Sequence, residues 1–246
     1  MVSTRSRTVA IVQARMSSSR LPGKVLAPIL GQPMLLRQLE RIGRSAQIDE
    51  IVVATSVEPG DDRVAEICRQ TGIRCVRGSL HDVLARYVQA ADESDAEIVL
   101  RLTADCPFTD PAVIDGLVQL MTDGDLDYAS NTLERTWPHG LDVEAVKISA
   151  LRTAAGETDD AFDREHVTPF FHKNPDRFRL GSLTGGGHRA DYRLTVDFPE
   201  DLEVTTQIYE ALYPGNAAFT TDDVIDFLDT NPDIRALNSA HIILRN

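Results

Sequence analysis

Cysteine is scarce in this chain of 246 residues. The three cysteines, Cys68, Cys75 and Cys106, contain no CxxC pair, and an odd number cannot complete a disulfide framework. This pattern argues against a disulfide scaffold and against a structural zinc site. We therefore expect buried free thiols and a reducing, cytoplasmic environment.

Long apolar runs are also missing. No stretch approaches the roughly 18 apolar residues that a membrane-spanning helix needs. The opening residues, MVSTRSRTVAIVQARM, have an apolar run of only four residues, Val9 to Val12, and so lack the core of a signal peptide. We expect no contact with a membrane.

Basic residues are fewer than acidic ones, 25 against 38, and they are unevenly distributed along the chain. The net charge is −13, which makes a nucleic-acid backbone an unsuitable partner. Residues 1–50 nevertheless carry eight basic and three acidic side chains, so this segment has a net charge of +5 and the remainder has −18. A basic patch on an acidic protein predicts a small anionic ligand that binds locally.

Apolar periodicity predicts an α/β fold. Short apolar runs typical of buried strands alternate with segments of helical spacing. The expected strands are 8–14, 50–56, 73–78 and 96–105, and the expected helices are 32–45, 60–72, 79–94 and 110–124. Such alternation favours a mostly parallel sheet with helices on both faces, whose ligands bind at the carboxyl ends of the strands.

The pattern changes after about residue 125. Strands are expected at 127–131, 140–148, 177–183 and 191–199, and helices near 149–157 and 163–173. We predict one domain, with a nucleotide-binding half at 8–125, a smaller mixed α+β portion at 126–198 that includes a protruding subdomain, and closing helices within 199–246.

The loop QARMSSSRLPGK, which follows the first strand, concentrates groups that bind anions. Gly23 permits a tight turn, Ser17, Ser18 and Ser19 offer hydroxyl donors, and Arg15, Arg20 and Lys24 offer charge. The segment matches neither GxxxxGK[ST] nor GxGxxG. It predicts a triphosphate site of another kind; the alternative is a solvated basic loop.

The segment IVQARMSSSRLPGKVL closely resembles the signature of the cytidylyltransferases that activate acidic sugars, above all the spore-coat-polysaccharide type. The resemblance continues through GQPMLLRQLERI, VVATS, RGSLHDVLARY, RLTADCPFTDP, PHGLDVE, REHVTPFF and RLTVDFPEDL, and so spans most of the chain. It implies a nucleotide-diphospho-sugar-transferase-like fold, CTP as a substrate, Mg²⁺ as a cofactor, a small acidic acceptor such as a sugar acid or a phosphonate, and a homodimer joined through the smaller portion.

Two aspartates stand where apolar segments end. Asp105 closes VLRLTAD and Asp197 closes YRLTVD, and each precedes a proline by two positions. Carboxylate oxygens suit Mg²⁺, and aspartates at matching family positions bind the metal. Helix capping is the alternative. The rival cluster Asp123, Asp125 and Asp127 resembles the DxD motif of glycosyltransferases, but a turn is the better interpretation.

The resemblance also assigns site residues. Arg15, Lys24, Asp105 and Asp197 are expected to be catalytic. The nucleotide-binding set is Gln13, Ala14, Arg15, Ser17, Arg20, Lys24, Thr55, Ser56, Arg77, Gly78, Thr103 and Asp105. The acceptor-binding set is His139, Asp142, Glu144, Arg164, Glu165, His166 and Arg193, for which a solvated, self-paired surface is the alternative. Two other functions stay open: glycosyl transfer from a nucleotide sugar, and nucleotide binding without catalysis.

Overall fold

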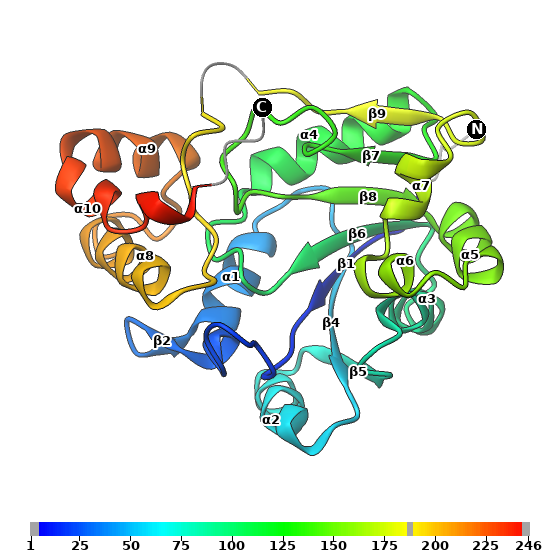
Figure 1. Ribbon diagram of the computed structural model, residues 1–246, viewed down its shortest axis with the longest axis horizontal. Helices are drawn as coiled ribbons and strands as arrows, with labels where there is room; N and C mark the ends of the chain where they lie inside the picture. The colour runs from blue at the N-terminus through cyan, green and yellow to red at the C-terminus, as the bar shows by residue number, and fades with distance from the viewer. Residues whose placement is uncertain (1–4, 186–188, 243–246) are drawn as a thin grey trace.

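A computed structural model describes residues 5–185 and 189–242. Its centre is a seven-stranded sheet in the order β5-β4-β1-β6-β8-β7-β9 (Figure 1). The strands β1 (Thr8–Gln13), β4 (Glu50–Ser56), β5 (Arg74–Gly78) and β6 (Ile98–Thr103) pair in parallel. The predicted mostly parallel α/β fold is thereby confirmed.

Alternate side chains of the central strands feed two separate cores. Ala10 and Val12 face one core, whereas Val9 and Ile11 face the other, as the twofold period of a strand requires. The first core is covered by α1 (Met34–Ile42), α2 (Asp62–Thr71) and α4 (Pro111–Asp123). Because both faces are buried, the central strand β1 consists largely of apolar residues.

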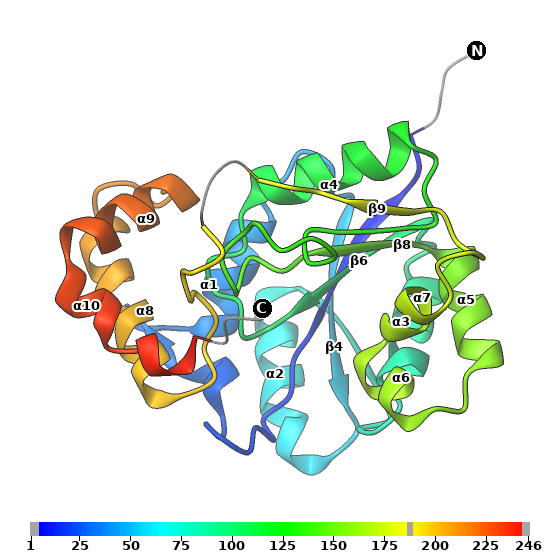
Figure 2. The ribbon, with the colours of Figure 1, turned by 45° about the horizontal axis from the view of Figure 1, so that its top comes forward.

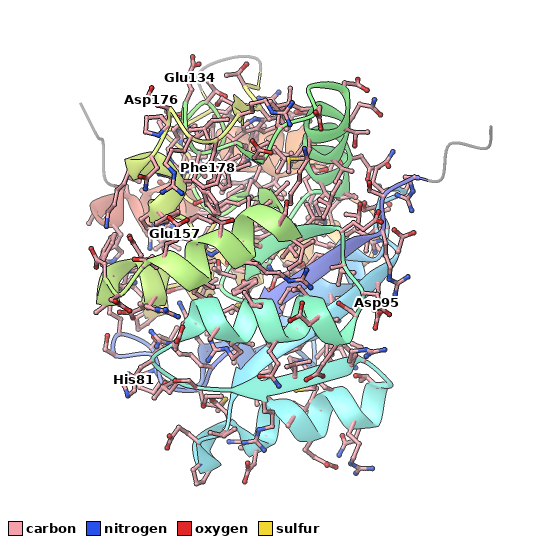
Figure 3. The ribbon with its side chains drawn as sticks, turned by 90° about the vertical axis from the view of Figure 1, so that its right-hand side faces the viewer. His81, Asp95, Glu134, Glu157, Asp176 and Phe178 are labelled. Carbon is pink, nitrogen blue, oxygen red and sulfur yellow. The ribbon has the colours of Figure 1, made fainter. Side chains whose placement is uncertain are left out.

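The second core is covered by α3 (Val83–Glu93), α5 (Ile148–Glu157) and α7 (Pro169–Lys173), with α6 (Ala161–His166) beside α3. Figure 3 looks onto this face, where α5 and α3 run side by side, with Glu157 near the end of α5 and with His81 and Asp95 at opposite ends of α3.

The smaller portion of the chain extends the same sheet. The strand β8 (Glu144–Lys147) pairs antiparallel with β6 and with β7 (Tyr128–Ser130), and β7 pairs in parallel with β9 (Leu180–Ser182). The strand predicted at 191–199 is wrong: in this described segment the only pairing is an isolated bridge between Arg193 and His139.

The helices near the C-terminus lie beside the sheet (Figure 2), and a third apolar cluster packs around them. It joins α8 (Pro199–Leu212) and α9 (Thr221–Thr230) to Phe108 and Met34, and α10 (Pro232–Ala236) lies next to them. The small elements are the 3₁₀ turns η1 (Lys24–Leu26), η2 (Pro59–Asp61) and η3 (Ser239–His241) and the hairpin strands β2 (Pro28–Ile29) and β3 (Gln32–Pro33).

Local sequence signals explain where several helices begin and end. The Asp110 side chain accepts a hydrogen bond from the main-chain nitrogen of Ala112, and Pro111 occupies the first turn of α4. Gly72 ends α2 in the left-handed conformation, at φ 73°. Among the described residues, no helix combines the length and apolarity needed to cross a bilayer.

Candidate nucleotide and cation site

The loop after β1 folds back on one carbonyl group. The Met16 carbonyl oxygen accepts hydrogen bonds from the main-chain nitrogens of Ser18 at 3.0 Å and Gly23 at 2.9 Å. Gly23 has φ 76°, a conformation that favours glycine, and it leads directly into η1. The Met16 nitrogen donates to Asp61 Oδ1 at 2.7 Å, which fixes the loop to the turn η2 that follows β4. Asp61 was not among the site residues predicted from the sequence.

The loop delivers Lys24 to both predicted metal ligands. Lys24 Nζ lies 2.9 Å from Asp105 Oδ2 and 2.8 Å from Asp197 Oδ1, and it also donates to the Val196 carbonyl oxygen at 2.8 Å. Lys24 is only 8% exposed. Residues that are far apart in sequence therefore meet at one point, as predicted, although Asp197 follows a segment with an isolated bridge and not a strand.

The charges at this point stabilise one another. Burial lowers the pKa of Lys24, but the Asp105 charge and hydrogen bonds to both carboxylates raise it by more, so the net shift is upward. Burial raises the pKa of Asp197, but hydrogen bonds from Lys24 and Arg20 lower it to about 2. Arg20 Nη2 lies 2.7 Å from Asp197 Oδ1, so two cations share one carboxylate oxygen.

Main-chain hydrogen bonds hold the two aspartates next to each other. The Asp105 carbonyl oxygen accepts from the Val196 nitrogen at 2.8 Å and from Thr195 Oγ1 at 3.1 Å. Gly140, at φ 106°, allows the chain to pass this segment closely, because a Cβ atom there would lie 2.3 Å from the Thr195 nitrogen. The pairing of the aspartates is thus built into the backbone.

A buried ion pair supports the Asp197 turn. Asp201 Oδ2 accepts hydrogen bonds from the nitrogens of Asp197 at 2.9 Å and Phe198 at 3.0 Å, and from Arg193 Nη2 at 2.8 Å. Asp201 Oδ1 accepts from Arg193 Nε at 2.8 Å and Asn238 Nδ2 at 3.0 Å. Arg193, predicted to bind the acceptor, is 4% exposed and engaged by its own chain.

The residues predicted to read the base lie at the ends of β4 and β5. Arg77 Nε donates to the Ser56 carbonyl oxygen at 2.9 Å, and Ser56 Oγ hydrogen-bonds to Asp61. Gly78 ends β5 beside them, and its carbonyl oxygen accepts from the Val57 nitrogen at 2.9 Å. These contacts join two strand ends into one rim of the site.

The other predicted nucleotide contacts differ in exposure. Ala14 is buried against β4, and Ser17 is exposed. Within the described part of the chain, the buried atoms Gln13 Oε1 and Thr55 Oγ1 have no hydrogen-bond partner. Arg15 lies 3.8 Å from Glu165, which links the loop to α6.

A cavity of about 300 Å³ lies where the acceptor was expected. Four of its lining residues were predicted, namely Thr103, Asp142, Glu144 and His166. The others were missed: Arg101, Thr132, Arg135, Phe162 and Thr168. Arg101 and Thr103 share one face of β6, because residues two apart in a strand point the same way. This spacing could have predicted that Arg101 lines the same cavity as Thr103.

The cavity contains two ion pairs. Arg101 Nη1 pairs with Glu144, whose other oxygen accepts from the Tyr128 hydroxyl at 2.5 Å. Burial raises the pKa of Glu144, but the Arg101 charge leads several contacts that lower it by more. Arg135 pairs with both Asp142 oxygens, at 2.9 and 3.2 Å, and its side chain is 36% exposed. The cavity is therefore polar and close to charge-balanced.

A strained turn shapes the cavity wall. Val167 has φ 71° and ψ −53°, and the Thr168 nitrogen donates to the His166 carbonyl oxygen at 2.8 Å, which closes a γ-turn. Such a conformation costs about 1–3 kcal/mol for a β-branched residue. It places His166 and Thr168, the two neighbours of Val167, along the cavity.

Two predicted acceptor residues are held elsewhere. Arg164 Nη1 lies 3.1 Å from Asp82 Oδ2, and its other nitrogens donate to the carbonyl oxygens of Thr158 and Ala155. His139 Nδ1 lies 3.3 Å from Arg193 Nη1, and burial is the largest cause of its lowered pKa. These contacts give Arg164 and His139 structural partners outside the lining of the cavity.

The rival acidic cluster forms a surface turn. Asp125 has φ 46°, and its side chain is 69% exposed. It pairs with Lys147 and Arg179, each at 2.6 Å, and Asp127 lies within 4 Å of the same two cations. The turn interpretation fits this arrangement better than a metal site.

A larger hollow of about 690 Å³ lies at the opposite end of the strands. It surrounds Glu50 and Arg74, at the amino ends of β4 and β5. Ligands of parallel α/β sheets bind at the carboxyl ends of the strands. The Lys24 region and the smaller cavity are therefore the candidate site.

The donor set suits a hard divalent cation. Asp105 and Asp197 direct carboxylate oxygens at the same point, where Lys24 Nζ lies. Among the described residues, no group of three or more His, Cys, Asp or Glu could hold a metal ion. Mg²⁺ would take these two oxygens from the protein and the rest from water and phosphate, which is its usual coordination in nucleotide sites.

Comparison with known proteins shows the family to which the chain belongs. The cytidylyltransferase family model matches residues 9–220. The spore coat polysaccharide biosynthesis protein SpsF of Bacillus subtilis is 35% identical over 233 residues, which cover 91% of this chain and 94% of SpsF. A cytidylyltransferase structure from Leptospira borgpetersenii superposes with a TM-score of 0.89 at 31% identity, over 94% of this chain and 97% of the other.

A more distant structure has the same fold. The CMP:2-keto-3-deoxy-manno-octonic acid synthetase, complexed with CTP, superposes with a TM-score of 0.65 at 20% identity, over 83% of this chain and 99% of the other. The predicted nucleotidyltransferase-type fold is thereby confirmed. The chain belongs to the cytidylyltransferase family of nucleotidyltransferase enzymes.

Proposed function

We propose that this enzyme transfers CMP from CTP to a small acidic acceptor, such as a sugar acid or a phosphonate, with Mg²⁺ as cofactor and pyrophosphate as the other product. The observation that carries the proposal is the meeting of Lys24 with Asp105 and Asp197, at distances of 2.9 and 2.8 Å. This is the charge arrangement that a triphosphate and a divalent ion need at one place.

The loop residues bind and orient the triphosphate. Arg15, Arg20 and Lys24 are within one loop, and exposed Ser17 lies between them. Their fixed charges stabilise the negative charge that develops on the departing pyrophosphate. When bound, Mg²⁺ neutralises charge on the α-phosphate. Asp105 and Asp197 would hold it, and the hydrogen bond from the Val196 nitrogen to the Asp105 carbonyl oxygen keeps the two residues close together.

The cavity beside Thr103 is the proposed acceptor site. Its two ion pairs and three threonine hydroxyls suit a hydroxyl-rich molecule that carries an acid group. Arg135 is the cation best placed to pair with that group, because 36% of its side chain is exposed. An anionic oxygen of the acceptor needs no general base, whereas a hydroxyl would need one.

Other parts of the proposal draw on the relatives. The name of the Bacillus subtilis relative supports a role in polysaccharide biosynthesis. Free thiols at all three cysteines suit the cytoplasm, where CTP is available. We also propose a homodimer, which sedimentation of the purified chain would test.

The direct test is pyrophosphate release with each of the four nucleoside triphosphates, Mg²⁺ and a panel of sugar acids and phosphonates. CTP should support release, and Asp105→Asn and Asp197→Asn should abolish it. Asp125→Ala is the matched control and should keep wild-type activity. Release with UTP alone, or loss of activity only in Asp125→Ala, would contradict the proposal and favour glycosyl transfer.

A second test addresses the acceptor cavity. Arg135→Met should raise KM for the acceptor at least about tenfold, since it removes a charge-assisted contact, while KM for CTP stays unchanged. Arg152→Met removes an exposed arginine paired with Asp92 and serves as the control. An equal rise in KM for CTP would contradict the assignment of this cavity to the acceptor.

A further inference from the structure

The Lys24 ammonium has no free donor. Its three contacts, to Asp105 Oδ2, Asp197 Oδ1 and the Val196 carbonyl oxygen, use all three of the hydrogens that a lysine ammonium carries. The residue is 8% exposed, so its side chain is enclosed with these partners. In this arrangement Lys24 contacts the carboxylates and has no hydrogen left for a phosphate.

Both carboxylates are also engaged, Asp197 by more cations than Asp105. Asp197 Oδ1 contacts Arg20 as well as Lys24, and Asp197 Oδ2 lies 3.4 Å from Arg193 Nη2. Among the described residues, the Cys106 thiol is the one hydrogen-bonding group near Asp105 Oδ1, at 3.6 Å. A cation of the chain itself, Lys24, therefore already contacts one oxygen of each carboxylate.

A divalent ion cannot share these oxygens with the ammonium. Mg²⁺ binds carboxylate oxygen at about 2.0–2.1 Å. An ammonium that kept its present contacts would then lie within a few ångströms of the ion, where like charges repel strongly. Lys24 must move away before a cation can bridge Asp105 and Asp197.

We propose that Lys24 is a built-in counter-cation that excludes divalent ions from the Asp105–Asp197 pair until a triphosphate draws its ammonium away. This inference rests on the proposed function for the identity of the anion. Lys24 then has two alternative sets of partners, carboxylates without nucleotide and phosphate oxygens with it. Nucleotide and cation consequently bind with positive coupling, and the coupling is reciprocal. The device prevents the carboxylates from binding a metal ion in the absence of nucleotide.

The first test measures Mn²⁺ binding to the nucleotide-free protein, from the electron paramagnetic resonance signal of free Mn²⁺. Lys24→Gln and Lys24→Met should bind Mn²⁺ at least about tenfold more tightly than the wild type, although both lose activity. Arg152→Met, which removes an equal charge at an exposed position, should stay within about twofold. Adding Asp105→Asn to Lys24→Gln should abolish the gain. Equal or weaker Mn²⁺ binding by Lys24→Gln overturns the proposal.

Thermal unfolding gives a second measure that also reports folding. Mn²⁺ at one fixed concentration should raise the Tm of Lys24→Gln by more than that of the wild type, because a ligand stabilises the state it binds. If Lys24→Met does not fold, Lys24→Gln decides the outcome, since glutamine keeps hydrogen-bond donors without the charge. Equal Tm shifts in Lys24→Gln and the wild type overturn the proposal.

The third test concerns the nucleotide. In EDTA, Lys24→Gln should bind CTP at least about tenfold more weakly than the wild type, measured by calorimetry. Equal affinity overturns the proposed exchange of partners. Pyrophosphate release by the wild type distinguishes failure of the proposed function from failure of the proposed exchange of Lys24 partners. If the wild type releases pyrophosphate but Lys24→Gln binds Mn²⁺ no more tightly than the wild type, only the exchange of partners is refuted. Tighter Mn²⁺ binding without release from any nucleotide refutes only the proposed function.

Discussion

Asp201 offers the sharpest test of how the Asp197 turn is held. It is 1% exposed and accepts five hydrogen bonds, two of them from Arg193. Asp201→Asn keeps the size and shape of the side chain but removes its negative charge. It also replaces one acceptor oxygen with an NH₂ group, which would face the hydrogen-bond donors that now surround Asp201. The other carboxylate near Arg193 is Asp197, at 3.4 Å, so the buried guanidinium loses its main partner.

The expected loss is large for a single atom exchange. Removing one partner of a buried ion pair costs about 3–5 kcal/mol, which is a substantial share of a stability of about 5–15 kcal/mol. For a chain of this size, that loss corresponds to a fall in Tm of about 6–20 °C. Urea unfolding followed by circular dichroism would measure it, with an unchanged m value.

Two further variants make the result decisive. Asp222→Asn removes a carboxylate that is 67% exposed and paired with Arg189, so it should cost no more than about 1 kcal/mol. Adding Arg193→Met to Asp201→Asn should recover part of the loss, because it removes the unpaired charge. A loss below about 1 kcal/mol for Asp201→Asn, or no recovery in the double variant, would refute the reasoning.

Three other expectations follow from packing and charge. Gly140→Ala should cost at least about 2 kcal/mol in urea unfolding because its Cβ would meet the Thr195 nitrogen, whereas Gly156→Ala, with open space around it, should be neutral or stabilising. Leu117→Ala, at a fully buried position, should lower the unfolding free energy by about 2–5 kcal/mol. His139 has a lowered pKa in the folded state, so its contribution to stability is present above about pH 6.5 and is lost as the pH falls; His139→Gln should flatten the dependence of unfolding free energy on pH between 7 and 5. A steeper dependence, or equal losses for the two glycine variants, would contradict these assignments.

Predictions from the sequence succeeded best where a local pattern of residues has a single physical explanation. Apolar runs such as Val9 to Val12 identified the central strands because both faces of a parallel sheet are buried. The loop from Arg15 to Lys24 predicted an anion site because a surface loop does not require so much positive charge. The meeting of Lys24 with Asp105 and Asp197 was predicted from strand ends and family likeness together.

Elsewhere, long-range packing decided what local sequence could not. The pattern DYRLTVDFP alternates like a strand, yet its backbone makes only one bridge and is held instead by the Asp105 carbonyl and by Asp201. Arg164 and Arg193 were predicted to bind the acidic acceptor, but each pairs with an aspartate of its own chain. Arg135 carried no local signal, because its exposure depends on which loops pack around it.

The hydrogen bond from the Val196 nitrogen to the Asp105 carbonyl oxygen has a consequence during synthesis. A nascent chain that has emerged only as far as β9 already contains all seven strands, yet it lacks Asp197. Fragments released early by the ribosome, or clipped before Tyr192, would retain most of the sheet without a second carboxylate. Under the proposed function, such fragments lack one of the two proposed metal ligands and should release no pyrophosphate.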